Sequence, residues 1–145
     1  MTCTVRVTAA DPEVARVSTR RHQFAVGRPL EFDETSPRIS ALEYAVGAIA
    51  GEVVNGLRQF AWRHRIDLDR VEAVATGELI NGLAYLEVVG ETGQPRIARM
   101  RLKLYVATAD EPGVRRLWSE LLERLPLFCT MRSAFPIDLE LTMTP

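Results

Sequence analysis

The stretch AVGAIAGEVVNGL, Ala45 to Leu57, decides the fold of this chain. It is built almost wholly from small and apolar residues, and one carboxylate, Glu52, lies in its middle. Apolar residues recur through and around it at intervals of three and four, which is typical of an amphipathic helix. They are Leu42, Val46, Ile49, Val53, Leu57 and Phe60. Because alanine and glycine let other backbones approach closely, we expect this helix to be central, packed on a sheet and on its own copy in a dimer.

Both ends of this helix carry recognisable signals. Ser40 and Glu43 have the spacing of a capping box, in which the hydroxyl and the carboxylate accept hydrogen bonds from backbone N–H groups that the first turn leaves free. His64 and Arg65 place cations where the helix dipole is negative. The sequence therefore predicts a helix that begins after Ser40 and ends near His64.

Short alternating segments precede the helix and predict three strands. They cover residues 5–7, 14–17 and 23–26, and the first two are joined by a turn at Asp11-Pro12. Residues 30–38 are rich in acidic and hydroxyl side chains and are interpreted as a loop. A small antiparallel sheet is therefore expected before the long helix.

Three further strands are predicted after the helix. Residues 71–80 and 97–107 alternate apolar and polar side chains, and residues 83–89 are interpreted as the strand between them. Asn81-Gly82 is a strong hairpin signal, and Glu91–Pro95 provides a second turn. Together these segments predict a three-stranded antiparallel meander.

The end of the chain completes an α+β pattern. Apolar periodicity predicts a helix at 112–125, a short helix at 127–133 and a final strand at 137–143. The order of elements predicts an α+β fold with antiparallel sheets around a long central helix. A chain of this length is expected to form one domain over residues 1–145.

Composition and charge argue against several classes of function. The net charge is −1, so no basic field draws the protein to nucleic acid or to an anionic membrane. No apolar run reaches the roughly 20 residues that a membrane span needs. The N-terminus lacks the apolar core of a signal peptide. We therefore expect a cytoplasmic protein with neither membrane nor nucleic-acid partners.

The sequence also predicts no metal and no cofactor. Cys3 and Cys129 are the only cysteines, and neither has a second Cys or a His at metal-ligand spacing. Asp67 and Asp69 are interpreted as part of a turn. The glycines of the central stretch lie inside the predicted helix rather than in a phosphate-binding loop.

Three short sequence segments, taken in order, resemble the OsmC/Ohr family of hydroperoxide-related bacterial proteins. Ser40-Ala41-Leu42-Glu43-Tyr44, continuing to Gly51, resembles the start of that family's central helix. Arg65-Ile66-Asp67-Leu68-Asp69, leading into 71–79, resembles the approach to its later strands. Arg124-Leu125-Pro126-Leu127, followed by Thr130-Met131 and Pro136-Ile137, resembles its Cys-Pro-Val segment and last strand. The resemblance covers roughly residues 20 to 143.

This resemblance implies an OsmC-like fold, an intertwined homodimer and two sites at the subunit interface. In active members of the family each site uses two cysteines. One thiolate attacks the peroxide O–O bond and becomes a sulfenic acid, which the second thiol resolves to a disulfide. An arginine and a glutamate beside them favour the thiolate and polarise the peroxide.

Carried over residue by residue, the family's sulfur positions are occupied by other side chains. The attacking cysteine falls at Glu52, and the resolving cysteine, taken as the residue before Pro126, falls at Leu125. A shifted register would instead place Cys129 at the resolving position. The activating glutamate falls at Leu42, with Glu43 as its neighbour, and Arg20 or Arg21 fills the place of the arginine.

The leading functional hypothesis is a non-redox relative. A carboxylate cannot cycle through sulfenic acid and disulfide, so the dithiol reaction is absent if this register holds. The interface pocket would remain and would bind a small, partly apolar ligand. Glu52 would form a structural ion pair, with an arginine from the early strands as its partner, or point into an open cleft. The sharper alternative is that it binds or protonates the ligand.

Two other functions stay open at this point. One is a thiol-dependent hydroperoxide reductase that acts through Cys129 alone, against the simpler interpretation of Cys129 as a small buried apolar residue. The other is an acid/base enzyme in which Glu52 works with an arginine. The sequence names no nucleophile–base pair for this last function.

Overall fold

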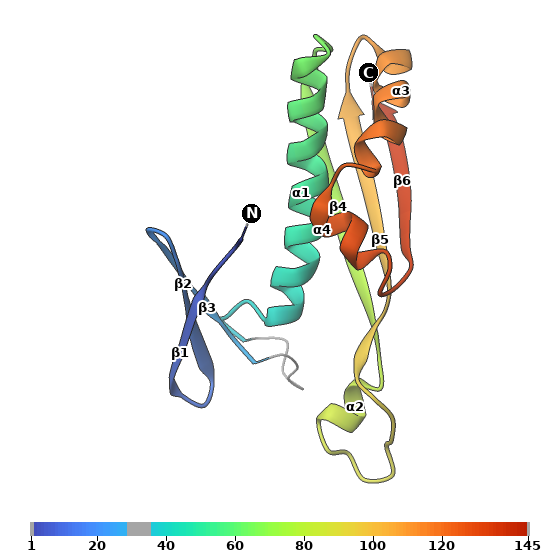
Figure 1. Cartoon of the computed structure of the whole chain (residues 1–145). Helices are drawn as coiled ribbons and strands as arrows, with labels where there is room; N and C mark the ends of the chain where they lie inside the picture. Colours follow the sequence, from blue (N-terminus) through green and yellow to red (C-terminus); the bar gives the residue numbers. More distant parts are fainter. Residues whose placement is uncertain (1, 29–35, 145) are drawn as a thin grey trace.

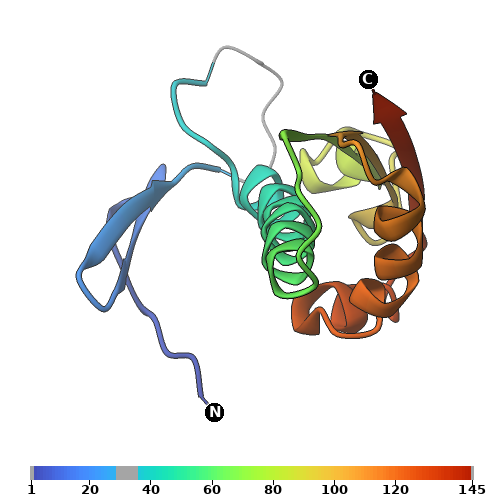
Figure 2. The same cartoon turned by 90° about the horizontal axis from the view of Figure 1, so that it is seen from above.

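The computed structural model describes residues 2–28 and 36–144. A long helix, α1 (Ala41–Arg63), lies between two three-stranded sheets (Figure 1). Seen from above, the N-terminal sheet stands on one side of α1, while the second sheet and two further helices lie on the other (Figure 2). The predicted α+β architecture around a central helix is confirmed.

The N-terminal sheet consists of β1 (Arg6–Asp11), β2 (Val14–Thr19) and β3 (His22–Val26), all antiparallel and in that spatial order. The three strands predicted before the helix are therefore confirmed. The loop expected at 30–38 lies mostly outside the described residues. Its described part, residues 36–38, belongs to no helix or strand.

Helix α1 begins and ends where its signals indicate. The Ser40 backbone N–H donates to Glu43 Oε2 at 2.7 Å, and the Glu43 N–H donates to Ser40 Oγ at 3.2 Å, so the capping box is formed. His64 closes the helix, and its N–H donates to the carbonyl of Phe60. In the described part of the chain, neither α1 nor any other helix is long and apolar enough to span a membrane.

The second sheet contains β4 (Arg70–Ile80), β5 (Arg96–Ala107) and β6 (Ile137–Thr144). β4 and β5 are antiparallel, but β6 runs parallel to β5, so the expectation of purely antiparallel sheets is wrong here. The reason is the connection, since α3 (Glu111–Leu122) and α4 (Pro126–Met131) carry the chain back to the start of β5. A crossover of this kind joins parallel strands.

The strand predicted at 83–89 is also wrong. A short helix, α2 (Gly82–Tyr85), begins the connection between β4 and β5, which pair directly with each other. Asn81 has a left-handed φ of 56°, but Gly82 does not have the positive φ that a two-residue hairpin turn requires. Asn81 Nδ2 instead donates to the carbonyl of Gln94 at 3.0 Å and closes the connection as a wide loop.

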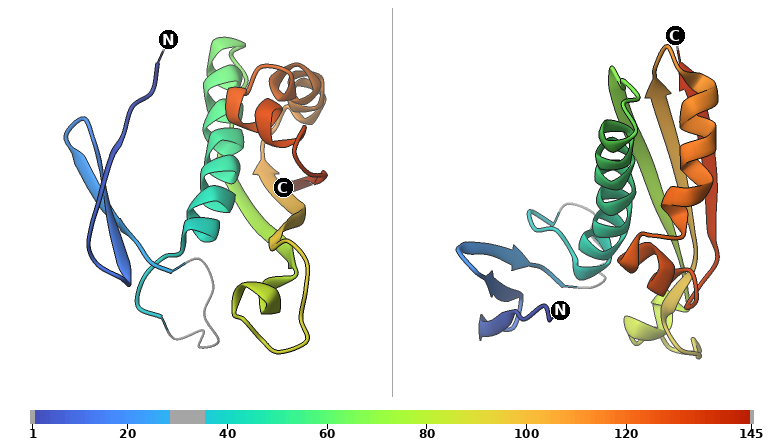
Figure 3. Two further views of the ribbon diagram at one scale, coloured as in Figure 1. Left: turned by 60° about the horizontal axis from the view of Figure 1, so that its bottom comes forward. Right: turned by 45° about the horizontal axis from the view of Figure 1, so that its top comes forward.

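The core lies between α1, α3 and one face of the second sheet (Figure 3). β5 supplies alternate residues to this core, because successive side chains of a strand point to opposite faces. Its inward members Met100, Leu102, Leu104 and Val106 are fully buried, and Val53, Leu57, Val114 and Leu121 pack against them from the helices. This core fixes one side of α1 in place. The candidate site described below involves the other sides of the helix.

Candidate functional site

The carboxylate of Glu52 binds the start of α4. Its Oε1 accepts a hydrogen bond from the backbone N–H of Leu127 at 3.0 Å, and its Oε2 accepts one from Phe128 at 2.7 Å. N–H groups in the first turn of a helix have no partner within the helix. Leu125, at the N-cap, offers no side-chain hydrogen bond. Glu52 therefore caps α4 from a different helix, and its negative charge suits the positive end of that helix.

This arrangement differs from the ion pair expected for Glu52. Within residues 2–28 and 36–144, Glu52 makes no ion pair with an arginine. Arg20 and Arg21 lie in the turn between β2 and β3 and are exposed, on the sheet that lies on the other side of α1 from the second sheet (Figure 2). The partners of the carboxylate in this chain are backbone amides.

Leu125 lies in the core beside α1, close to Glu52 in the fold. It is buried, and its side chain packs on Gly56, one turn further along the helix. A Cβ added at Gly56 would lie 2.6 Å from Leu125 Cδ2 and 3.1 Å from Leu121 Cδ1. Glycine at this position lets the segment before α4 approach the backbone of α1.

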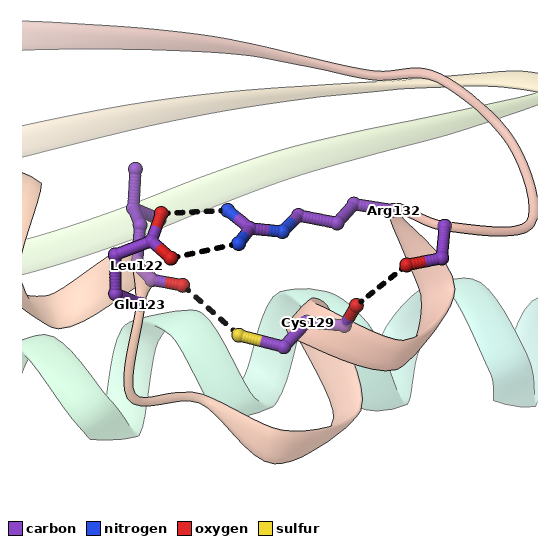
Figure 4. A network of polar contacts seen from close by, with 5 residues as sticks. Leu122, Glu123, Cys129 and Arg132 are labelled. Atoms are coloured by element: carbon purple, nitrogen blue, oxygen red, sulfur yellow. Dashed lines mark hydrogen bonds and ion pairs between the residues drawn. The ribbon is translucent and has the colours of Figure 1, made fainter.

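Cys129 is half-buried on α4 and its thiol is already engaged. Its Sγ donates to the carbonyl oxygen of Leu122 at 3.3 Å, as Figure 4 shows. The nearby Arg132 guanidinium makes two hydrogen bonds to the Glu123 carboxylate, at 2.9 and 2.8 Å. This pairing raises the pKa of Arg132 and lowers the pKa of Glu123. The guanidinium of Arg132, which lies near the thiol, is therefore committed to a carboxylate.

A groove of about 580 Å³ runs between the N-terminal half of α1 and β4. Leu42 and Glu43, two of the residues predicted for the pocket, line it. Small residues provide its floor, which explains how a groove remains between a helix and a strand. The lining comprises Ser40, Leu42, Glu43, Val46, Gly47 and Ala50 of the helix, Ala73, Ala75, Thr76, Gly77 and Leu79 of β4, and Ile97 of β5.

The predicted site residues thus occupy three places. Glu52, Leu125 and Cys129 gather at the start of α4, Leu42 and Glu43 line the groove, and the arginine pair lies on the N-terminal sheet. The sequence reasoning missed the backbone N–H groups of Leu127 and Phe128. A signal for them exists, because Pro126 marks the start of a helix that no side chain before it can cap.

No cluster in the described residues has the composition of a metal site. Within them, no group of three or more His, Cys, Asp or Glu side chains is placed to hold an ion. The chemistry available at the start of α4 is hydrogen bonding by a carboxylate, and that in the groove is apolar contact beside one carboxylate and two hydroxyls.

The fold is similar to solved structures of OsmC-like and organic hydroperoxide resistance proteins. An OsmC-like protein from Mycoplasma pneumoniae matches with a TM-score of 0.80 and 13% identity, over 100% of this chain and 99% of that one. An organic hydroperoxide resistance protein from Elizabethkingia anophelis matches at 0.74 and 12%, over 99% of both chains. The organic hydroperoxide resistance protein OhrB of Bacillus subtilis matches at 0.61 and 17%, over 97% and 98%.

No family model matches the sequence, and no curated protein does so. At the identities found, structural similarity establishes the fold. The chain therefore has the OsmC/Ohr fold, as its sequence resemblance predicts, and its chemistry has to be argued from its own residues.

Proposed function

We propose that this chain is a member of the OsmC/Ohr family that lacks dithiol peroxidase chemistry, forms a homodimer and binds a small, partly apolar ligand. The observation that carries the proposal is the Glu52 carboxylate, which occupies the position assigned to the attacking thiol and is bound by two backbone N–H groups. A carboxylate held in this way serves the structure of the protein.

The chemistry of the two positions supports the loss of the redox cycle. In that cycle a sulfur gives two electrons to the peroxide O–O bond, and a second sulfur displaces hydroxide from the sulfenic acid to form the disulfide. Glu52 has no sulfur to oxidise, and Leu125 has no thiol to resolve an intermediate. The contact between Glu52 and the segment that follows Leu125 agrees with assigning the two family cysteines to these positions.

The groove beside α1 supports the retained binding function. Its volume of about 580 Å³ lies within the range of roughly 300–1,000 Å³ that is usual for small-molecule sites. Among the described residues its lining is largely apolar, with polar side chains at Ser40, Glu43 and Thr76. Leu42, to which the activating glutamate of the family maps, and its neighbour Glu43 both belong to it.

Two features support a homodimer. The N-terminal sheet and the residue before it expose large apolar side chains, with Val5, Val7 and Phe24 at 50%, 56% and 38% exposure. Gly47 and Gly51 lie inside α1, where glycine costs about 0.5–1 kcal/mol relative to alanine. A Cβ at either position would meet nothing within 4 Å in this chain. A second copy packed closely on this face would explain both glycines.

The runner-up function, a hydroperoxide reductase using Cys129, has less support. The Sγ–H of Cys129 donates a hydrogen bond to the Leu122 carbonyl. This contact requires the thiol proton, whereas the nucleophile would be the deprotonated thiolate. Arg132 does not compensate, since its guanidinium is paired with Glu123. The other alternative, an acid/base enzyme, also has less support, because Glu52 is bound by backbone amides in place of an arginine.

Peroxidase assays test the proposal directly. The purified protein is given cumene hydroperoxide with dithiothreitol or a lipoylated reductant, and loss of peroxide is followed beside a protein-free control. We expect no turnover above the control. Robust turnover that disappears in Cys129→Ser would overturn the proposal in favour of the thiol-dependent function.

A double variant tests the assignment of positions 52 and 125. Glu52→Cys with Leu125→Cys is expected to form an intrachain disulfide on peroxide treatment, whereas either single variant is not. The disulfide is measured by a mobility shift on non-reducing gels after blocking of free thiols, in a Cys3→Ser, Cys129→Ser background. A folded double variant that forms no disulfide contradicts the assignment.

A further inference from the structure

A small pocket lies between the end of α1 and the first turns of α3, which begins beside it (Figure 1). Its volume is about 260 Å³. Ile66 and the buried Leu117 offer apolar contact within it. Charged or titratable side chains make up most of the remaining lining, and they are His64, Arg65, Asp110, Arg116 and Glu120.

The pocket lies away from the face of α1 that the proposed homodimer would use. The stripe that contains Gly47 and Gly51 continues at helical spacing to Trp62, which is 80% exposed. His64 instead continues the buried stripe of Leu57, and α3 packs on that stripe. The pocket and the glycine face therefore lie on different sides of the helix.

Both carboxylates of the lining are engaged within α3 and its N-cap. Asp110 Oδ1 accepts a hydrogen bond from the backbone N–H of Gly113 at 2.9 Å and so caps the helix. Glu120 pairs with Arg124, one turn further along α3, at 3.0 Å. Each of these carboxylates thus already has a donor of its own.

The basic side chains of the lining have no such partners. Within residues 2–28 and 36–144, the side chains of Arg65, Arg116 and His64 make no hydrogen bond and no ion pair. The positive end of the α3 dipole lies at the same place and favours an anion. Two guanidinium groups and an imidazole are therefore available to a ligand of negative charge.

Arg65 occupies a backbone position that favours glycine. Its φ of 58° lies in the left-handed region. Its N–H donates to the carbonyl of Trp62 at 3.2 Å, and the N–H of Ile66 donates to that of Ala61 at 2.9 Å. These are the bonds of a Schellman motif, in which glycine is the usual residue at this position. Because this conformation is disfavoured for a residue with a Cβ, an arginine here indicates a role for its side chain.

We propose that this pocket binds the phosphate group of a small phosphate monoester through Arg65, Arg116 and His64. A guanidinium presents paired N–H donors that match the oxygens of a phosphate. The volume lies below the roughly 300–1,000 Å³ of ordinary ligand pockets, which restricts the ligand to a small molecule. The site is separate from the groove and from the start of α4, so the inference goes beyond the proposed function and does not depend on it.

Isothermal titration calorimetry of the full chain at pH 7 tests the site with phenyl phosphate as the probe. Benzoate and phenol carry the same ring with one negative charge and with none. We expect the affinity to fall in the order phenyl phosphate, benzoate, phenol, because attraction to the guanidinium groups falls with the charge of the ligand. Arg116→Gln is expected to weaken the binding of phenyl phosphate about tenfold, since a hydrogen bond between charged groups is lost. Arg115→Gln is the matched control, because this neighbour pairs with Glu111 outside the pocket, and it is expected to leave the affinity unchanged.

Arg65→Gly separates a binding role from a structural one. Glycine suits the left-handed backbone and removes the guanidinium. We expect the free energy of unfolding in urea not to fall, while the affinity for phenyl phosphate falls about tenfold. A residue with a structural role alone would change the stability and leave the binding as it was.

Four results would overturn the inference. The first is an absence of phenyl phosphate binding, and the second is binding that Arg116→Gln and Arg65→Gly leave unchanged. A loss in Arg115→Gln as large as that in Arg116→Gln would show general charge attraction in place of a site. Benzoate that binds as tightly as phenyl phosphate would overturn the assignment to phosphate. Circular dichroism confirms that each variant is folded.

Discussion

The two halves of α1 pack against different surroundings, although the same apolar periodicity runs through both. Residues 41–48 include no buried residue, whereas the second half buries Ile49, Val53, Gly56, Leu57 and Ala61. α3, α4 and β5 pack on this second half, while the first half borders the groove. Helical periodicity therefore identifies a face that contacts something, without distinguishing the protein's own core from a groove.

The two glutamates of this helix repeat the contrast on a smaller scale. Glu43 accepts from the backbone N–H of Ser40 within its own turn, so sequence spacing alone predicts its role. Glu52 accepts from Leu127 and Phe128, which are distant in sequence. One carboxylate caps its own helix and the other caps a neighbouring helix, and only the second ties two parts of the fold together.

The largest expected effect comes from truncating the buried half of α1. Leu57 is completely buried, so Leu57→Ala removes apolar contacts and leaves a cavity, at a cost of about 2–5 kcal/mol in the free energy of unfolding. The matched change Leu42→Ala in the groove is expected to cost less than about 1 kcal/mol, since this side chain is only half-buried. Urea denaturation measures both, and equal losses would contradict the contrast between the halves.

Removing the tertiary cap is expected to have the next largest effect. Glu52→Ala leaves two N–H groups of α4 without their carboxylate and should cost about 1–3 kcal/mol. Glu52→Gln retains one acceptor oxygen, so its free energy of unfolding should lie between that of Glu52→Ala and that of the unaltered protein. Glu120→Ala is the control, because it removes only an exposed pair with Arg124, worth about 0.3–0.5 kcal/mol. A loss no larger than that of the control would show that Glu52 does not stabilise α4.

Alanine at two glycines of α1 sharpens the comparison between packed and free faces. Gly56→Ala forces Leu125 and Leu121 to move and is expected to lower the free energy of unfolding by about 1–2 kcal/mol. Gly51→Ala meets no atom of its own chain, so we expect it to leave folding intact and to weaken the proposed homodimer. Denaturation and analytical ultracentrifugation separate the two results. An unchanged dimer in Gly51→Ala would remove the explanation offered for that glycine.

Much of the fold is predictable because its signals are local. The capping box at Ser40, the stripe through α1 and the alternation of β5 each lie within one element, and the structure confirms all three. The prediction of a strand at 83–89 was wrong because Asn81-Gly82, taken by itself, indicates a tight hairpin turn. In the structure the side chain of Asn81 instead bonds to the carbonyl of Gln94 and closes a wider loop. The parallel pairing of β6 is likewise set by the crossover through α3 and α4, which no single strand encodes.

The site is less predictable for the same reason. The assignment of positions 52 and 125 to the site follows from the resemblance of short sequence segments, but the hydrogen-bond partner of the Glu52 carboxylate does not. A charged side chain on a half-buried face needs hydrogen bonds, and a search among side chains favours an arginine. The actual donors are the backbone N–H groups of Leu127 and Phe128, which every sequence possesses and which only the tertiary fold brings to Glu52.

The smallest expected effect is a dependence of stability on acid pH that comes from Glu43. Its hydrogen bonds with Ser40 lower its pKa below the ordinary value of 4.5 in the folded protein. Its contribution is therefore fully present above about pH 4.5 and is lost as the pH falls through the lower folded value. Glu43→Gln should reduce the fall in Tm between pH 7 and pH 3, measured by circular dichroism, and Glu123→Gln should do likewise because Arg132 lowers the pKa of Glu123. Since both carboxylates are exposed, each change in Tm should be smaller than that produced by Glu52→Ala. A larger effect from Glu43→Gln would mean that the first turn of α1 holds the fold together as firmly as its buried half.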